Sequence, residues 1–286
     1  MKQNNLFINK KYNSLKKQIN YYNLSDYNKI IVYGENCNNL INLLSIRDID
    51  NIHDNSFFSI FMHKNKFIDE VIIIRLSHLK YLIISKNNKT YKKLKKLSKI
   101  YKSTSVSLIS KLFIYSLHGN LTSLKKSRNI FPVSHQGYNY KLYVSKNNDT
   151  LNSIFPNIFK LSVDNYKLFL YNNNVITNFN IKNKKIRLNL IKALYSADNY
   201  NFRCKPQFIK VKQFEATANF IPEKESIIYD TSNNKIGIIH NYFRLSNKRY
   251  PFIIGIINKY NDNKYIFIKD KITKQKIILK HRKIYN

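Results

Sequence analysis

Apolar and polar residues alternate along the first part of the chain in a way that predicts short strands followed by helices. The stretch "NKIIVYGENCNNLINLLS" begins with an apolar run at residues 29–33, turns at Gly34, and continues with leucines at helical spacing, Leu40, Leu43 and Leu44. The next stretch, "FFSIFMHKNKFIDEVIIIRLSHLKYLIIS", contains three extended segments separated by the polar turns "HKNK" and "LSHL". Three such segments in succession indicate an antiparallel meander.

Helices and strands continue to alternate in the middle of the chain. In "KTYKKLKKLSKIYKST" the apolar residues Leu94, Leu97, Ile100 and Tyr101 form one stripe among lysines, which predicts an amphipathic helix of about four turns. "KLFIYSLHGNLTSLKK" again favours a strand, a glycine turn and a helix, and a further helix is expected over residues 184–196. This order of elements is typical of an α+β protein with mainly antiparallel sheets and flanking helices.

The last part of the chain has a different pattern. From "ESIIYDTSNNKIGIIHNYFRL" to "KDKITKQKIILKHRKIY", short apolar runs alternate with turns that contain Asn or Asp, and there is no helical stripe. This pattern predicts a small all-β module that resembles a barrel. We therefore expect an N-terminal tail at residues 1–24, an α+β region at 25–220 with a further division near residue 128, and a C-terminal β module at 221–286.

The net charge of the chain is strongly basic. Its 286 residues include 50 Lys and Arg but only 16 Asp and Glu, a formal charge of +34, which favours a nucleic acid or another anionic partner. The abundant residues are those with AT-rich codons, and drift in an AT-rich genome explains scattered surface lysines equally well. The 22 Tyr and 18 Phe are interpreted as core, with stacking platforms for single-stranded RNA as the alternative. Nucleic acid is therefore kept as an alternative partner.

Several classes of protein are not supported by the sequence. Arg75, His78 and Lys80 interrupt the longest apolar stretch, so no membrane span is expected, and the basic N-terminus lacks the apolar core of a secretory signal. Cys37 and Cys204 are too few for a disulfide framework or a four-ligand metal site, and the seven histidines are spread singly. There is no glycine-rich nucleotide loop. We expect a soluble, cytoplasmic protein without a metal site.

Four short stretches, taken in order, carry a family pattern. "NKIIVYGENCNNLINLLSIRDI" has an opening strand, a glycine turn and an Asp-Ile ending, and "KFIDEVIII" has an acidic pair, Asp69 and Glu70, before a β-branched run. "LFIYSLHGN" keeps Gly119, and "IIYDTSNNKIGIIHNYF" keeps Gly237 in an Ile-Gly-x-Ile pattern. From about residue 24 to 275 the chain resembles the superfamily shared by the glycine-cleavage T-protein, an aminomethyltransferase, and the YgfZ-type folate-binding proteins of iron–sulfur cluster maintenance.

The stretch "NFRCKPQFIKVK", at residues 201–212, separates the two branches of this superfamily. YgfZ-type proteins carry the signature K-G-C-Y-x-G-Q-E-x-V-A-R, which T-proteins lack. A similar order is kept here at Cys204, Pro206, Gln207, Ile209 and Lys212, the last in place of the arginine. The stretch departs from the signature at Arg203 and Phe208, and the glycine before the glutamine is missing. It resembles a diverged YgfZ motif.

The resemblance implies a fold and a function for the whole chain. The fold would have two related subdomains around a central cavity, followed by the small barrel-like module. The protein would bind tetrahydrofolate in the cavity and support the assembly or repair of iron–sulfur clusters in client enzymes, including those that modify tRNA, without being a classical enzyme. The implied partners are iron–sulfur client or assembly proteins, and we expect a monomer.

Four residues are candidates for the site on this resemblance. Asp69 is implied to lie beside the reacting nitrogen of tetrahydrofolate, Arg187 to face the pterin or the glutamate tail, and Gln207 to contact the folate. Cys204 lies between two cationic residues, which favour the thiolate, so it is a candidate redox or metal-touching thiol. The alternatives stay open: a turn-capping Asp69, an Arg187 on a helix surface, and a Cys204 packed as a small apolar residue.

Two rival functions remain. "FPVSHQGYNYKLYV" has no acidic residue where T-proteins carry the Gly-Glu pair that binds the pterin ring, and Gly137, Tyr138 and Asn139 stand there instead. A degenerate aminomethyltransferase that uses tetrahydrofolate would depend on Asp69 and on a lipoyl carrier protein as its partner. A basic RNA-binding protein would bind RNA with an affinity that falls steeply with salt.

Overall fold

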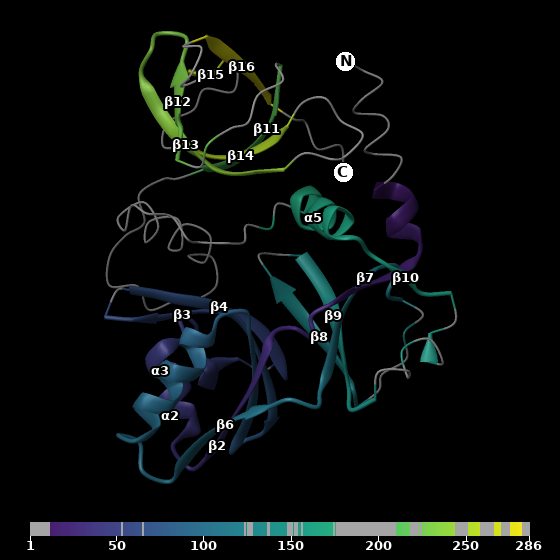
Figure 1. Ribbon diagram of the computed structural model, residues 1–286, viewed down its shortest axis with the longest axis vertical. Helices are drawn as coiled ribbons and strands as arrows, with labels where there is room; N and C mark the ends of the chain where they lie inside the picture. Colours follow the sequence, from purple (N-terminus) through teal and green to yellow (C-terminus); the bar gives the residue numbers. More distant parts are fainter. Residues whose placement is uncertain are drawn as a thin grey trace. The chain divides into compact units, whose positions relative to one another are not determined.

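The computed structural model describes most of the first 175 residues and the strands of the last third of the chain (Figure 1). The described residues are 12–52, 54–64, 66–122, 124, 128–135, 138–147, 151, 154–155, 157–173, 175, 210–217, 223, 225–243, 251–257, 266–269 and 275–281. The chain divides into two compact units, residues 1–177 and 178–286. Each unit has its own sheets and its own apolar core.

A five-stranded antiparallel sheet with the order β3-β4-β5-β2-β6 forms the first half of unit 1. Its strands are β2 (Asn28–Gly34), β3 (Ser56–His63), β4 (Lys66–Ser77), β5 (Lys80–Ser85) and β6 (Thr104–Ile109). Two helices, α2 (Cys37–Leu44) and α3 (Asn88–Ser98), pack side by side on this sheet, and a 3-10 turn, η1 (Ile49–Asn51), follows α2 (Figure 1). The predicted strand-turn-helix opening and the meander are therefore confirmed. The amphipathic helix is confirmed at Leu94 and Leu97, but it ends at Ser98, so Ile100 and Tyr101 lie beyond it and Ile100 is exposed.

The core of this first half lies between the sheet and the two helices. It forms there because alternate strand residues and one stripe of each helix are apolar. Leu40, Ile41 and Leu44 of α2 are buried, and Leu94 and Leu97 of α3 pack into the same cluster. The opposite side of α3 is occupied mainly by lysines, which stay in solvent.

A second five-stranded sheet, with the order β10-β1-β7-β9-β8, completes unit 1. Its strands are β1 (Ile19–Asn23), β7 (Phe113–Gly119), β8 (Ile130–His135), β9 (Tyr138–Ser145) and β10 (Phe159–Lys160). Neighbouring strands are antiparallel except β1 and β10, which are parallel. The helix α5 (Val163–Asn172) follows β10.

Two details of this sheet differ from the sequence-based expectation. Residues 19–23 fall in the expected tail but form β1, because "INYYN" pairs along its backbone with β7 although it lacks apolar alternation. The helix expected after Gly119 is not seen at residues 120–122. There, Asn120 Oδ1 accepts hydrogen bonds from the backbone N–H (3.3 Å) and the hydroxyl (2.6 Å) of Thr122. An Asx turn of this kind competes with helix formation.

The two faces of the second sheet carry different side chains, because successive residues of a strand point to opposite sides. One face is apolar, and its buried cluster consists of Tyr115, Leu117, Leu124, Tyr143, Leu151 and Phe155. The other face is polar and aromatic, and α5 covers it. Its strand residues include Ser116, His118, Tyr138 and Tyr140, which contact Tyr166 and Phe169 of α5 through His118.

Unit 2 contains a closed antiparallel barrel with the strand order β11-β14-β13-β12-β15-β16. Its strands are β11 (Lys210–Ala216), β12 (Ile227–Asp230), β13 (Lys235–Phe243), β14 (Phe252–Ile257), β15 (Ile266–Lys269) and β16 (Lys276–His281). The barrel interior is close-packed: a Cβ on Gly255 would lie 2.8 Å from both the Phe214 ring and Ile228 Cδ1. The predicted barrel-like module is confirmed, and β11 shows that its strands begin before residue 220.

The predicted fold class, α+β with mainly antiparallel sheets, is confirmed by these three sheets and their few helices. The domain limits expected at residues 24, 128 and 220 stay predictions. Within the described ranges, we find no helix that combines the length and the apolar character needed to cross a membrane.

Candidate functional site

Of the four predicted site residues, only Asp69 lies among the described residues. Arg187, Cys204 and Gln207 lie outside them, so their convergence with Asp69 on one cavity stays a prediction. The candidate site is therefore built from Asp69 and from the side chains that surround it in unit 1.

Asp69 holds the start of helix α3 against strand β4. Its side chain is 8% exposed, and Oδ2 accepts hydrogen bonds from Ser85 Oγ (2.5 Å), the backbone N–H of Asn87 (3.0 Å) and Thr90 Oγ1 (3.0 Å). These donors come from the end of β5 and the first turn of α3, so this oxygen acts as a turn-capping carboxylate. Among the described residues, all three of these donors bind Oδ2.

Tyr27 connects Asp69 electrostatically to the aromatic residues under α5. Burial, with smaller contributions from Tyr22, Glu70 and Asp69, raises the pKa of Tyr27 to about 12. The same phenol contributes to the raised pKa values of Tyr140 and Tyr166. Tyr27 is therefore coupled electrostatically both to the carboxylates of β4 and to two tyrosines of the α5 face.

A layer of aromatic side chains covers the α5 face of the second sheet. His118 is central: Nδ1 lies 2.7 Å from the Tyr138 hydroxyl, and Nε2 lies 3.0 Å from Ser116 Oγ. Tyr22 stacks on Tyr166, with ring centroids 4.0 Å apart and planes at 3°. We call the following residues the aromatic layer: Tyr22, Tyr27, His118, His135, Tyr138, Tyr140, Tyr166 and Phe169.

His135 ends strand β8, at the place where the two sheets of unit 1 meet. It lies opposite Tyr138 in the ladder and stacks on Phe58 of β3, with ring centroids 3.5 Å apart and planes at 16°. Next to this stack, Ser56 Oγ of β3 donates a hydrogen bond to the carbonyl of Pro132 in β8. His135 is 4% exposed, and its Nε2 has no hydrogen-bond partner among the described residues. A buried ring nitrogen without a partner is costly, which makes it a candidate contact for a ligand.

Burial keeps the aromatic layer uncharged at neutral pH. It lowers the pKa of His118 and that of His135 to about 3, so both imidazoles are neutral. It also raises the pKa values of Tyr138, Tyr140 and Tyr166 above that of an ordinary phenol, so these hydroxyls stay protonated. The layer therefore offers aromatic faces and neutral hydrogen-bonding groups instead of a charged acid or base. Such groups suit a flat heteroaromatic ring.

The sequence analysis did not identify the aromatic layer. It treated the histidines as isolated, although strand β9 lies between β7, which carries His118, and β8, which carries His135. A local signal was present in two alternating pairs, Ser116 with His118 and Tyr138 with Tyr140, because period-two spacing places each pair on one face of a strand. The pairing of β7 and β8 with β9 was not visible in the sequence.

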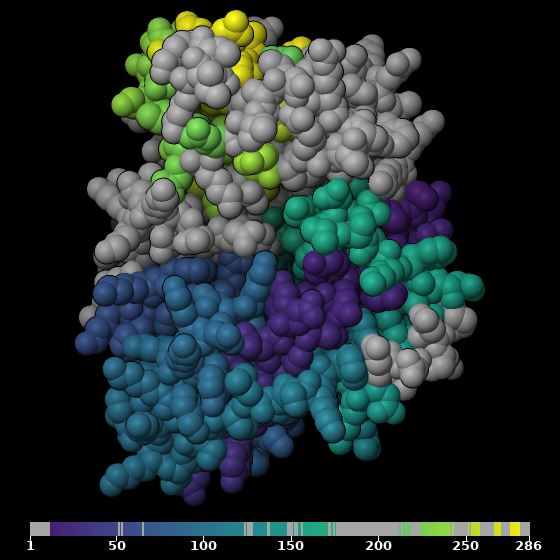
Figure 2. Space-filling model, in the orientation of Figure 1, coloured from purple at the N-terminus to yellow at the C-terminus, as the bar shows by residue number. Residues whose placement is uncertain are grey.

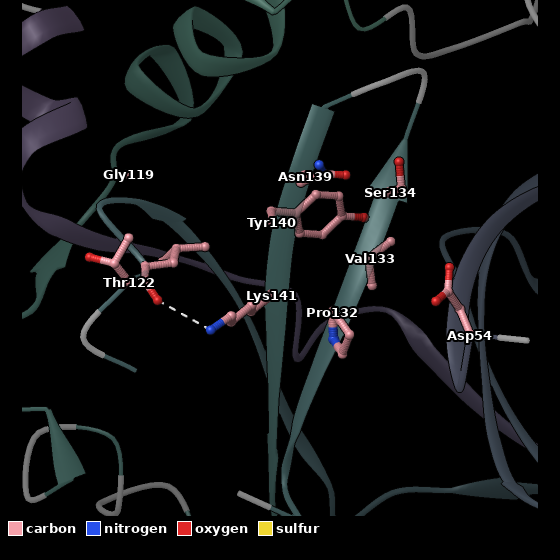
Figure 3. A pocket seen from close by; sticks show the side chains of 10 residues that line it. Asp54, Gly119, Thr122, Pro132, Val133, Ser134, Asn139, Tyr140 and Lys141 are labelled. Atoms are coloured by element: carbon pink, nitrogen blue, oxygen red, sulfur yellow. Dashed lines mark hydrogen bonds between the residues drawn. The ribbon is translucent and has the colours of Figure 1, made fainter. Parts of the chain in front are cut away.

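A pocket of about 520 Å³ lies along β8 and β9 (Figure 3). Asn139 and Lys141 point into it, away from the aromatic layer, because they alternate with Tyr138 and Tyr140. Lys141 Nζ donates hydrogen bonds to the backbone carbonyls of Leu121 (3.2 Å) and Leu124 (3.4 Å), which fixes the loop that forms one wall. The other polar residues that line the pocket are Asp54, Thr122, Ser134 and Tyr140, and Tyr140 also belongs to the aromatic layer. Asp69 is not among the described residues that line this pocket.

Comparison with known proteins identifies the fold. No protein-family model matches the chain, and no curated protein matches it. Among solved structures, the chain is similar to the glycine cleavage system aminomethyltransferase T from Bartonella henselae. The TM-score is 0.63 and the sequence identity 13%, over 97% of this chain and 88% of that chain. An identity this low shows the fold alone, which is T-protein-like, as the resemblance implied.

Proposed function

We propose that this protein binds a reduced folate in unit 1, at the aromatic layer next to His135. The observation that carries the proposal is the T-protein-like fold, which extends over nearly the whole chain and which an aminomethyltransferase shares. The buried, unpartnered Nε2 of His135 supports it, because a ring nitrogen in that position can accept or donate one hydrogen bond to a ligand.

The residues of the aromatic layer fit the chemistry of a pterin. A pterin is a flat ring with hydrogen-bonding groups along one edge, and it needs aromatic faces and neutral partners in a desolvated site. His135 and Phe58 already form one such stack. Tetrahydrofolate, when bound, would supply the one-carbon carrier. The chain's own residues would bind and orient it.

We further propose that folate binding serves an accessory role in the assembly or repair of iron–sulfur clusters, with client or assembly proteins as partners. The electrostatics of the described site support an accessory role over transfer chemistry. Both buried histidines are neutral, and one oxygen of Asp69 is committed to Ser85, Asn87 and Thr90. The resemblance of residues 201–212 to a YgfZ-type motif supports the iron–sulfur part.

A second candidate function is aminomethyl transfer onto tetrahydrofolate. The similarity to a solved structure named as an aminomethyltransferase favours this second candidate. It requires Asp69 to act on the ligand through Oδ1, and a lipoyl carrier protein as the partner. Formation of methylenetetrahydrofolate from an aminomethyl-lipoyl carrier, lost on Asp69→Asn with folate binding retained, would favour this candidate over the accessory role.

Calorimetric titration of tetrahydrofolate into the purified chain tests the binding proposal. The informative variant is His135→Phe, which keeps a flat ring against Phe58 but removes both ring nitrogens. Loss of one hydrogen bond worth about 1.4 kcal/mol predicts about tenfold weaker binding. His78→Phe is the matched control, because His78 is exposed in the turn between β4 and β5.

Two results would contradict the proposal. One is the absence of heat at millimolar tetrahydrofolate with the unaltered chain. The other is equal affinity in the His135→Phe and His78→Phe variants. The iron–sulfur role has its own test, in which the folate-loaded protein raises the recovery of an oxygen-damaged cluster enzyme. Equal recovery with the His135→Phe variant would refute the link between folate binding and that role.

A further inference from the structure

Helix α3 carries a stripe of lysines on its solvent side. Lys89, Lys92, Lys93 and Lys96 are spaced i, i+3, i+4 and i+7, which places them on one face of the helix. Lys89, Lys92 and Lys96 are exposed and Lys93 is half-buried. The blue segment that contains α3 lies at the surface of unit 1 in Figure 2.

Neighbouring elements extend this stripe into a wider surface. Lys93 and Lys64 both lie close enough to His63 to lower the pKa of its imidazole, after the larger effect of burial. Lys64 occupies the tip of the β3-β4 hairpin with a left-handed φ of 49°. The exposed Lys66 starts β4, and the exposed Lys86 precedes α3. We call the following residues the lysine face: Lys64, Lys66, Lys86, Lys89, Lys92, Lys93 and Lys96.

The lysine face is not neutralised by the protein's own carboxylates. Within the described part of the chain, none of its seven ammonium groups forms an ion pair. The first turn of α3 holds no acidic residue. Asp69 lies nearby, but it is buried and accepts hydrogen bonds from Ser85 and Thr90. Lysines at i and i+4 repel one another, and those near a helix N-terminus also oppose the helix dipole. An anionic partner would relieve both effects.

We propose that the lysine face binds the phosphate backbone of a nucleic acid. Lysines three or four residues apart on the stripe lie about 4.5 to 6 Å apart along the helix axis, from a rise of about 1.5 Å per residue, so several can contact one run of phosphates. A protein partner fits less well. Protein interfaces are depleted in lysine and centred on buried aromatic or arginine anchors, whereas the exposed positions of this stripe carry only lysine.

This binding surface is separate from the proposed folate site. It lies on the solvent side of α3, whereas the aromatic layer lies between the second sheet and α5. The proposal is also more specific than an argument from net charge. Attraction by +34 charges scattered over the surface would not depend on any one face of the protein. The inference therefore predicts that position, and not net charge alone, determines the affinity for nucleic acid.

Two variants with the same change in net charge test this prediction. The first replaces three residues of the lysine face: Lys89→Glu, Lys93→Glu and Lys96→Glu. The matched control replaces three exposed lysines elsewhere: Lys111→Glu, Lys146→Glu and Lys235→Glu. Binding of a single-stranded RNA of about 20 nucleotides is measured by fluorescence anisotropy across a salt series. A duplex DNA of equal length and polyglutamate serve as comparison probes.

The unaltered chain should bind RNA with an affinity that falls as salt rises. With a slope of about 0.7 per phosphate contact, loss of three contacts should lower affinity about 100-fold near 0.1 M salt and flatten the logarithmic salt slope by about 2. The control should lose less than about fivefold. Equal losses in the two variants would overturn the inference, as would binding of polyglutamate in preference to either nucleic acid, or no RNA binding at all.

The same variants separate this inference from the folate proposal. The lysine-face variant should keep its circular dichroism spectrum, because Lys89→Glu in the first turn of α3 suits the helix dipole and offsets Lys96→Glu in the last turn. Its heat of tetrahydrofolate binding should equal that of the unaltered chain. A variant that binds folate but not RNA supports the lysine face independently. A chain that binds RNA but not folate refutes only the folate proposal.

Discussion

The buried, neutral histidines of the aromatic layer should make unit 1 less stable in mild acid. Burial lowers the pKa of His118 and of His135 to about 3, while the same side chains in the unfolded chain titrate near 6.5. Above pH of about 6.5 both states are neutral and no stability is lost. Below it the unfolded chain takes up protons that the folded chain excludes, so the free energy of unfolding falls as the pH falls toward 3.

The size of the effect follows from the two pKa values. Between about pH 7.5 and pH 5.0, the free energy of unfolding should fall by about 2 kcal/mol for each histidine, or about 4 kcal/mol for the pair. This is a large part of the 5 to 15 kcal/mol that stabilises a typical domain. Few carboxylates titrate in this range, so the histidines should dominate the slope there.

Urea unfolding followed by circular dichroism at a series of pH values measures the slope. His135→Phe should remove about half of it and leave the stability at neutral pH equal or higher, because the substitution removes an unpartnered buried nitrogen. His78→Phe, at an exposed position, should leave the slope unchanged. A His135→Phe variant with the full slope of the unaltered chain would refute the claim that His135 is buried and neutral.

Two further substitutions test the architecture around the site. Asp69→Ala should lower the free energy of unfolding by about 3 kcal/mol, because it leaves the donors at Ser85, Asn87 and Thr90 without their shared acceptor, whereas the exposed Asp54→Ala should change it by less than about 0.5 kcal/mol. Equal effects in urea melts would disprove the capping role. Gly119→Ala should cost more than about 2 kcal/mol, since φ is 95° and the added Cβ would lie 2.0 Å from the carbonyl oxygen of Gln18. If Gly119→Ala lowered the melting temperature no more than a typical surface substitution does, the backbone around Gly119 would have adapted to the added Cβ.

The regular part of the fold was predictable because its signals are local. The stripe of Leu94 and Leu97 predicts α3, and three β-branched runs predict the meander, since each pattern is carried by residues that are close in sequence. Strand β1 was missed because "INYYN" has no apolar alternation and is held by its pairing with β7. Local periodicity does not report on pairing between strands that lie about 95 residues apart.

The candidate site was predictable only in part, and for the same reason. The position of Asp69, an acidic residue before a β-branched run, stood out in the sequence. The stacking of His135 on Phe58 did not, because it joins two strands about 75 residues apart along the chain. The burial that makes His118 and His135 neutral is likewise a property of the folded layers and has no local sequence signal. Roles for Arg187, Cys204 and Gln207 stay predictions.

The junction between β3 and β8 has a consequence for solubility. Each of these strands is the outermost strand of its own sheet, and an outermost strand presents unpaired backbone groups on which another chain can add by hydrogen bonding. Here Ser56 and Phe58 of one strand pack against Pro132 and His135 of the other, so each strand shields its counterpart. Loosening this junction would therefore expose two templates for aggregation at once.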